Sequence, residues 1–177
     1  AAAMAGMGRM NVLLGDVGQG EMQVLRGIGE MRNLNAYLEM AIQHQFLANI
    51  YHNAGRRDEA LVQAQDAVDA YTDAGAMDRS ATVHLIIADV QLERERFTAA
   101  MRALNVILKY GSEQREPALM AKAHAYVGIV QYALGDDGAA CAHLRAFRRM
   151  SSSIRGWADE RRAARHLWDK IGCDRYS

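Results

Sequence analysis

Three histidines, His44, His84 and His124, are spaced forty residues apart, and histidine is a common zinc ligand. A zinc ion needs its ligand atoms about 2 Å from a common centre. If the spacing reflects helical repeats, equivalent residues lie about 10 Å apart, because that is the distance at which helices pack. The three rings therefore cannot share one ion, and we expect each to fill a half-buried repeat position. The remaining histidines form no spaced pair with this set: His52, His143 and His166.

The segment from Asn11 to Glu21 imitates a phosphate-binding loop. Gly15 and Gly20 have the spacing of the G-x4-G-K-[ST] pattern, in which the lysine meets the phosphates and the hydroxyl meets magnesium. Here Glu21 and Met22 replace these two working residues. Because a carboxylate would repel phosphate, the sequence predicts no nucleotide site.

Cysteine chemistry is limited to Cys141 and Cys173, which are too few for a disulfide framework or, alone, for a four-ligand zinc site. We expect Cys141 to pack as a small apolar side chain and the protein to be cytoplasmic, in reducing surroundings. No serine or cysteine stands in a nucleophile elbow. Asp136 and Asp137 lie in a glycine-flanked turn and indicate a solvated helix start. The sequence thus predicts no catalytic residues, no metal, no cofactor and no enzyme activity.

Composition favours an all-α protein. Of 177 residues, 31 are alanine and one, Pro117, is proline, which suits helices throughout. The 21 basic and 21 acidic side chains leave no formal net charge, which argues against a generally basic nucleic-acid binder. No apolar run reaches 18 residues, so we expect no membrane span.

Shifting the sequence by forty residues aligns the segments 7–15, 47–55, 87–95 and 127–135. Two columns of this alignment, twelve residues apart, contain only glycine or alanine, an outcome with a chance on the order of 10⁻⁵ before allowing for the registers searched. Small residues at facing positions would let two antiparallel helices approach closely, with a left-handed residue in the turn between them. The columns are Gly8, Ala48, Ala88 and Gly128; Gly20, Ala60, Ala100 and Ala140; and, in the turn, Gly15, Gly55, Glu95 and Gly135.

The period predicts one domain over 1–177, with repeats at about 1–40, 41–80, 81–120 and 121–156. Second helices are expected over 61–71, 101–110 and 141–150, and polar connectors over 72–80, 111–117 and 151–156. A capping helix over 157–172 places Trp168 in a small column, where its bulk would cover the last repeat and block a further helix. The alternative is a boundary before an effector domain.

The best copy resembles the tetratricopeptide repeat, a pattern of large-x2-Leu-small-x2-Tyr followed by Ala-x3-large-x2-Ala. Its residues are His44, Leu47, Ala48, Tyr51, Ala60, Ala64 and Ala67. The period of forty exceeds the usual thirty-four, and resembles the variant found in bacterial signalling regulators. The resemblance implies a right-handed superhelical stack whose first helices line a concave face.

On the family pattern, the concave face would bind a peptide or protein partner. Asn49 resembles the asparagine with which related chaperone-tail binders hold a terminal carboxylate, but Asp89 would repel that group. The residues implied to line the face are Gln45, Asn49, His52, Leu85, Asp89, Leu92, Lys122, Ile129 and Tyr132.

Charge is distributed unevenly along the chain. Residues 58–78 contain six acids and no lysine or arginine, whereas residues 145–165 contain seven arginines and two acids. Both segments can be solvated outer faces, or can meet oppositely charged partners or each other in a homo-oligomer. Nucleic acid is disfavoured because few aromatic residues accompany the arginines.

Two functions remain open at this point. The first is a non-catalytic protein-interaction module. The second is the ligand- or peptide-sensing segment of a bacterial transcriptional or signalling regulator, in which a ligand changes the superhelical pitch.

Overall fold

The computed structural model describes residues 1–176, and within them every regular element is helical, which confirms the predicted all-α class. The chain folds into two compact units, Ala1–Val90 and Gln91–Ser177, each with a hydrophobic core of its own. The helices are α1 (Ala2–Leu13), α2 (Val17–Asn33), α3 (Tyr37–Asn53), α4 (Arg57–Asp73), α5 (Met77–Glu93), α6 (Phe97–Gln114), α7 (Pro117–Ala133), α8 (Asp137–Ser151), α9 (Ala158–Ile171) and the 3₁₀ helix η1 (Cys173–Tyr176).

A left-handed backbone residue stands in the turn after each helix from α1 to α7, at intervals of twenty residues. The expected turn column is confirmed, including Glu95, which adopts φ 56° without being a glycine. The same conformation recurs midway between those positions, at Asn35, Gly75 and Arg115. The expected connectors over 72–80 and 111–117 are therefore wrong, because helices continue through most of both ranges. The same short turn joins the two helices of a pair and joins one pair to the next, in place of the expected longer connectors.

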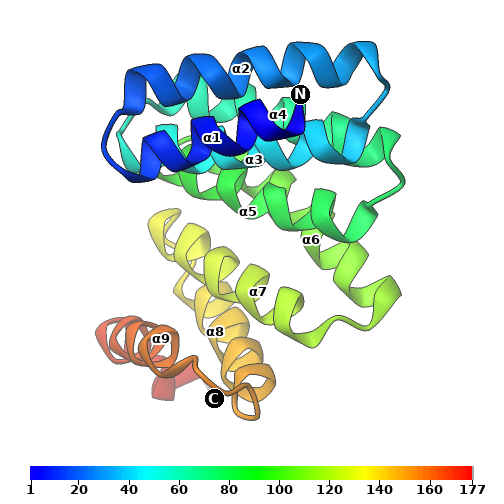
Figure 1. Cartoon of the computed structure of the whole chain (residues 1–177). Coiled ribbons are helices and arrows are strands. Elements are labelled where there is room, and N and C mark those ends of the chain that lie inside the picture. The colour runs from blue at the N-terminus through cyan, green and yellow to red at the C-terminus, as the bar shows by residue number, and fades with distance from the viewer. Residues whose placement is uncertain (177) are drawn as a thin grey trace. The chain divides into compact units, whose positions relative to one another are not determined.

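In the first unit, α1 packs along α2 and α3 along α4 (Figure 1). A Cβ atom built on Gly8 would lie 2.7 Å from the carbonyl oxygen of Gly20, so the two helix backbones touch at the predicted small positions. Ala48 and Ala60 occupy the same positions in the next pair and are fully buried. This packing confirms the small columns in the first unit.

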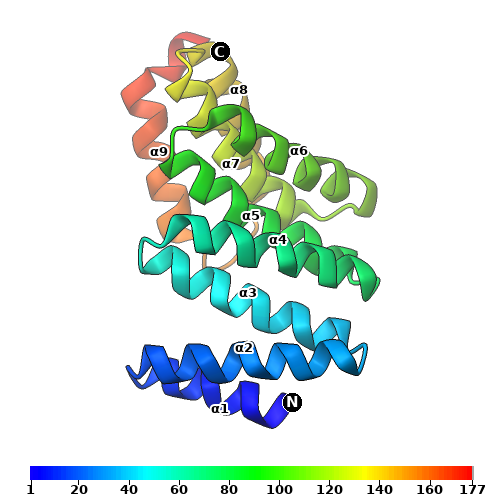
Figure 2. The same cartoon turned by 90° about the horizontal axis from the view of Figure 1, so that it is seen from above.

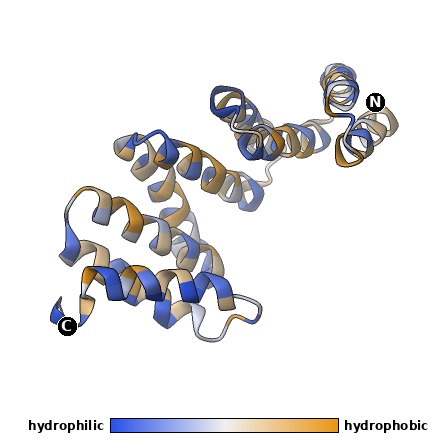
Figure 3. Ribbon diagram, turned by 90° about the vertical axis from the view of Figure 1, so that its left-hand side faces the viewer, coloured by the Kyte–Doolittle hydropathy of each residue, from blue (hydrophilic) through white to orange (hydrophobic). Residues whose placement is uncertain are grey.

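Hydrophobic and hydrophilic residues are interspersed along the helices (Figure 3). Exposure of apolar side chains is nevertheless high at the N-terminal end, where Met7, Met10, Leu13 and Leu14 are each more than half exposed. The first helix of the chain therefore leaves much of its apolar surface exposed.

In the second unit, α7 packs along α8, and Gly128 faces the Leu144 side chain and the Ala140 backbone. α9 and η1 lie against α8 (Figure 2). Trp168 of α9 is 5% exposed and belongs to the same core as Phe147. The prediction that Trp168 covers the last helix pair is confirmed.

Cys141 and Cys173 form a disulfide that joins α8 to η1, with a Cα–Cα distance of 5.4 Å. The expectation that Cys141 is merely a small apolar side chain is therefore wrong. The number of cysteines gave no indication of this bond. The chain turns back after α9, and this turn brings together two cysteines that are 32 residues apart in the sequence. The cysteines therefore do not indicate a reducing compartment, since disulfide bonds persist in oxidising surroundings.

Substituting Gly20 with alanine should lower the free energy of unfolding by roughly 1–3 kcal/mol, because the added Cβ would lie 2.5 Å from the Gly8 carbonyl oxygen. The matched control is Gly29→Ala on the same helix, where a Cβ meets nothing within 4 Å. That control should raise stability by roughly 0.4–1 kcal/mol through the lower entropy of the unfolded chain. Urea denaturation followed by circular dichroism measures both, and equal effects would contradict the close approach.

Reducing the Cys141–Cys173 bond should lower the free energy of unfolding by about 3–4 kcal/mol, the value expected for a loop of this size. Urea denaturation with and without a reductant measures the change. The control is Cys141→Ala/Cys173→Ala, whose stability should not respond to the reductant. If the natural chain is equally indifferent to it, the two thiols are not bonded.

Candidate functional site

The predicted concave-face residues of the first unit lie on α3 and α5. Gln45 accepts a hydrogen bond from the Tyr71 hydroxyl at 2.7 Å, so its side chain joins α3 to α4. Asn49 is exposed and donates to the Gln45 carbonyl oxygen at 3.0 Å. The His52 Nε2 and Asp89 Oδ2 atoms lie 3.8 Å apart, so the structure brings these two predicted residues together.

The half-buried Leu85 of α5 completes the predicted set in this unit. The mixture of an amide, a histidine–aspartate pair and an apolar side chain can hydrogen-bond a peptide backbone and pack against a side chain.

In the second unit, two of the predicted residues contact the C-terminal part of the chain itself. The Lys170 Nζ atom lies 5.2 Å from the centre of the Tyr132 ring, and the Lys122 Nζ atom lies 5.5 Å from the centre of a Trp157 ring. Tyr132 is also half-buried against the core of this unit, so only part of its ring is free for a ligand. Ile129 remains 42% exposed. Leu92, at the end of α5, is half-buried.

A pocket of about 560 Å³ in the second unit is lined by Arg145, Arg148, Arg149, Ser152 and Trp168. The three arginines stand at i, i+3 and i+4 of α8, which places them on one face of that helix. The Arg148 guanidinium lies 4.7 Å from the centre of the Trp168 ring, and that of Arg145 lies 5.7 Å from it. The pocket is therefore cationic, with an indole from α9 as an aromatic wall.

Two further hydrogen bonds hold this pocket. Arg145 donates to the Tyr176 carbonyl oxygen at 3.1 Å, and the Trp168 indole nitrogen donates to Asp174 at 3.1 Å. Within residues 1–176, neither Arg148 nor Arg149 forms an ion pair with a carboxylate. Sequence reasoning found the arginine-rich segment but left open whether it is a solvated face or meets an oppositely charged partner. The spacing of the arginines could have indicated a cationic face on one helix. No sequence signal indicated that Trp168, from a separate helix, would lie beside them.

The histidines of the column have separate partners in the structure. His44 Nδ1 lies 2.9 Å from the Gln63 amide oxygen, and His84 Nδ1 lies 2.9 Å from the Ser80 carbonyl oxygen. In the part of the chain that the structure describes, no group of three or more His, Cys, Asp or Glu side chains could hold a metal ion.

The expectation that His143 has no partner in the column is wrong, because His124 Nδ1 and His143 Nδ1 lie 2.9 Å apart. The two histidines are nineteen residues apart in the sequence. This separation places them on the first and second helices of one pair, whereas the forty-residue spacing places residues in successive repeats. Burial lowers the pKa of both rings, and the proximity of His143 lowers that of His124 further. One neutral ring must donate and the other accept, so the pair serves as a half-buried contact between α7 and α8.

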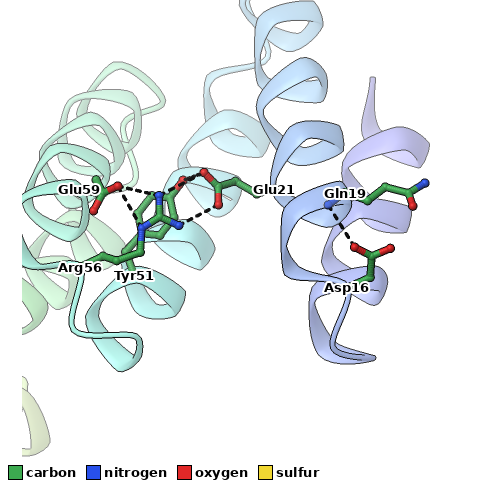
Figure 4. A network of polar contacts seen from close by, with 6 residues as sticks. All are labelled: Asp16, Gln19, Glu21, Tyr51, Arg56 and Glu59. Carbon is green, nitrogen blue, oxygen red and sulfur yellow. Dashed lines mark hydrogen bonds and ion pairs between the residues drawn. The ribbon is translucent and has the colours of Figure 1, made fainter.

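The apparent phosphate loop has a structural explanation. Asp16 caps α2 by accepting from the Gln19 backbone, and Gly15 supplies the left-handed turn. Glu21 accepts from the Tyr51 hydroxyl at 2.7 Å and from Arg56 at 2.9 Å (Figure 4). The carboxylate that replaces the lysine of the nucleotide pattern thus links α2 to the turn between α3 and α4.

Arg56 is central to this network. It also pairs with Glu59 at 2.6 Å and lies 4.2 Å from the centre of the Tyr51 ring. The hydrogen bond from Arg56 holds the pKa of Glu21 below its ordinary value, and the Tyr51 hydroxyl acts in the same direction. The network stabilises the contact between two helix pairs and leaves the Glu21 carboxylate little capacity for a ligand.

No protein-family model matches this chain, and no curated protein shows significant sequence similarity to it. In residues 1–176, no helix is both long enough and apolar enough to cross a bilayer.

Replacing Glu21 with glutamine should lower the melting temperature at pH 7 by ~2–4 °C, because the charged acceptor of Arg56 and Tyr51 is lost. The pKa of Glu21 is lowered in the folded protein, so its stabilisation is present above the ordinary pKa of the carboxyl and is lost as the pH falls through the folded value. The difference between the variant and the natural chain should therefore shrink on acidification below about pH 4.

Glu59→Gln is the control, since Glu59 pairs with the same arginine from an exposed position three residues away. Its effect should be smaller, as is usual for exposed pairs. Thermal melts at a series of pH values compare the two variants. A Glu21→Gln difference that is the same at pH 7 and pH 3 would exclude the ionised carboxylate as its source.

Proposed function

We propose that this protein is a non-catalytic interaction module of the tetratricopeptide-like kind, which binds a peptide or protein partner along its first helices. Three features support the proposal: the helix pairs, the twenty-residue alternation of helix and left-handed turn, and small residues at the contacts within pairs. A right-handed superhelical arrangement of these pairs is part of the proposal.

The observation that carries the proposal is that α3 and α7, a first helix from each unit, keep exposed side chains beside buried ones. On α3, Leu47 and Ala48 are fully buried, while the adjacent Asn49 is exposed. On α7, Val127 is buried while Ile129 is 42% exposed. The exposed faces mix apolar and hydrogen-bonding side chains, which is the combination that an extended peptide or a partner helix requires.

The proposed function does not include the predicted cytoplasmic location. A disulfide between Cys141 and Cys173 favours an oxidising compartment, because cytosolic reductants would open such a bond. A binding module built from helix pairs can work in either setting, so the proposed function does not depend on the compartment.

The proposal predicts that peptides selected against the whole chain from a random displayed library bind through the first-helix face. Ile129→Ala should weaken a selected peptide roughly tenfold, because it removes an exposed apolar contact from the proposed face. Val106→Ala is the matched control: Val106 is 43% exposed, also β-branched and in the same unit, but lies on the second helix α6. Titration calorimetry measures both, with circular dichroism to verify folding. Equal losses in the two variants would contradict the proposal.

A further inference from the structure

The arginine-lined pocket between α8 and α9 has unbalanced charge. Arg148 and Arg149 are exposed, stand side by side in the last turn of α8 and, within residues 1–176, have no carboxylate partner. Like charges one helical turn apart repel each other, and Arg145 and Arg149 have this spacing. The C-terminal end of the helix dipole offsets part of that repulsion. It does not account for the convergence of all three arginines on one pocket.

Arginines on the neighbouring helix show the contrasting situation. Arg162 pairs with Asp159 at 3.4 Å, and Arg165 pairs with Asp169 at 3.7 Å. Arg161 donates to the backbone carbonyls of the segment that precedes α9. These side chains have partners within the protein, whereas most N–H groups of Arg148 and Arg149 point to no protein acceptor among the described residues. The pocket arginines are therefore the ones available to an external anion.

The orientation of Arg145 and Arg148 is set before any ligand arrives. The Trp168 ring, 5% exposed and hydrogen-bonded to Asp174, is held by its burial and provides the surface over which Arg145 and Arg148 lie. The Tyr176 carbonyl fixes one nitrogen of Arg145. A side chain that is already oriented loses less entropy when it binds, and this favours recognition of a specific anion over diffuse attraction.

We propose that this pocket is a binding site for a phosphate monoester. A monoester carries close to two negative charges and three terminal oxygens, which matches three guanidinium groups better than the single charge and two oxygens of a carboxylate. Guanidinium forks bind phosphate oxygens in pairs, which the point charge of a lysine does not do. A volume of about 560 Å³ exceeds what a phosphate alone fills, and leaves room for the group that bears it.

The phosphate can come from a phosphorylated side chain of a partner or from a free phosphorylated small molecule. Both have the same monoester chemistry. The site uses α8 and α9 and none of the first-helix residues of the proposed function, so either proposal can fail without the other.

The test compares O-phosphoserine with glutamate as probes of the whole chain, by titration calorimetry at one fixed ionic strength. O-Phosphoserine should bind at least tenfold tighter than glutamate. Arg148→Gln/Arg149→Gln should weaken O-phosphoserine at least tenfold, because two of the three guanidinium groups are lost. The matched control, Arg162→Gln/Arg165→Gln, removes the same charge from α9 and should change the affinity less than twofold.

Three results would overturn the site: equal affinity for O-phosphoserine and glutamate, equal losses in the two double variants, or tighter binding of a phosphodiester oligonucleotide than of the monoester. The first result concerns the unmodified protein and stands whether or not a variant folds. Two further probes identify the source of the phosphate. Tighter binding of a phosphoserine peptide than of O-phosphoserine supports a phosphorylated chain as the ligand. Binding of O-phosphoserine that is as tight as that of the peptide, and tighter than that of inorganic phosphate, supports a free phosphorylated molecule.

Discussion

Close contact between the backbones of paired helices, clearest at α1 and α2, is the constraint on which the rest of this structure depends. At Gly8 and Gly20 a single added methyl group would overlap the opposite backbone. Alanines in the following pair are fully buried at the corresponding positions. Because the helices approach so closely, their larger side chains are directed to the flanks of the contact, where they form the cores and determine which residues stay exposed. A larger residue in the small columns would move the helices apart and displace those flanking side chains.

The turns between helices impose the second regularity. A left-handed residue every twenty positions reverses the chain within three residues. This reversal lets α1 pack along α2, α3 along α4 and α7 along α8. Glycine serves this role at four of the seven positions, while Asn35, Glu95 and Arg115 adopt the conformation despite their side chains. The backbone geometry is thus maintained by the packing of the helices on either side, even where the residue type does not favour it.

The C-terminal part of the chain completes the arginine-lined pocket on α8. Trp168 and the Cys141–Cys173 bond hold α9 and η1 against α8. This placement stacks an indole beside Arg145 and Arg148, and it puts Lys170 over Tyr132. The same segment therefore covers part of the predicted first-helix face and completes a cationic pocket on the second helix. The two surfaces have different chemistry: one is mixed and suited to a peptide, the other is cationic and suited to an anion.

The sequence by itself determined the helical class, the forty-residue period, the small columns, the turn column and the covering role of Trp168. These features follow from local rules: residue size at a fixed spacing and the backbone preference of residues in turns. Only the tertiary structure decided the pairing of Cys141 with Cys173, the contact between His124 and His143, and the meeting of three arginines with Trp168. Each of these contacts joins residues from separate helices, so it depends on how far each helix continues and on the direction in which its side chains point. Neither quantity can be read from a period in the sequence.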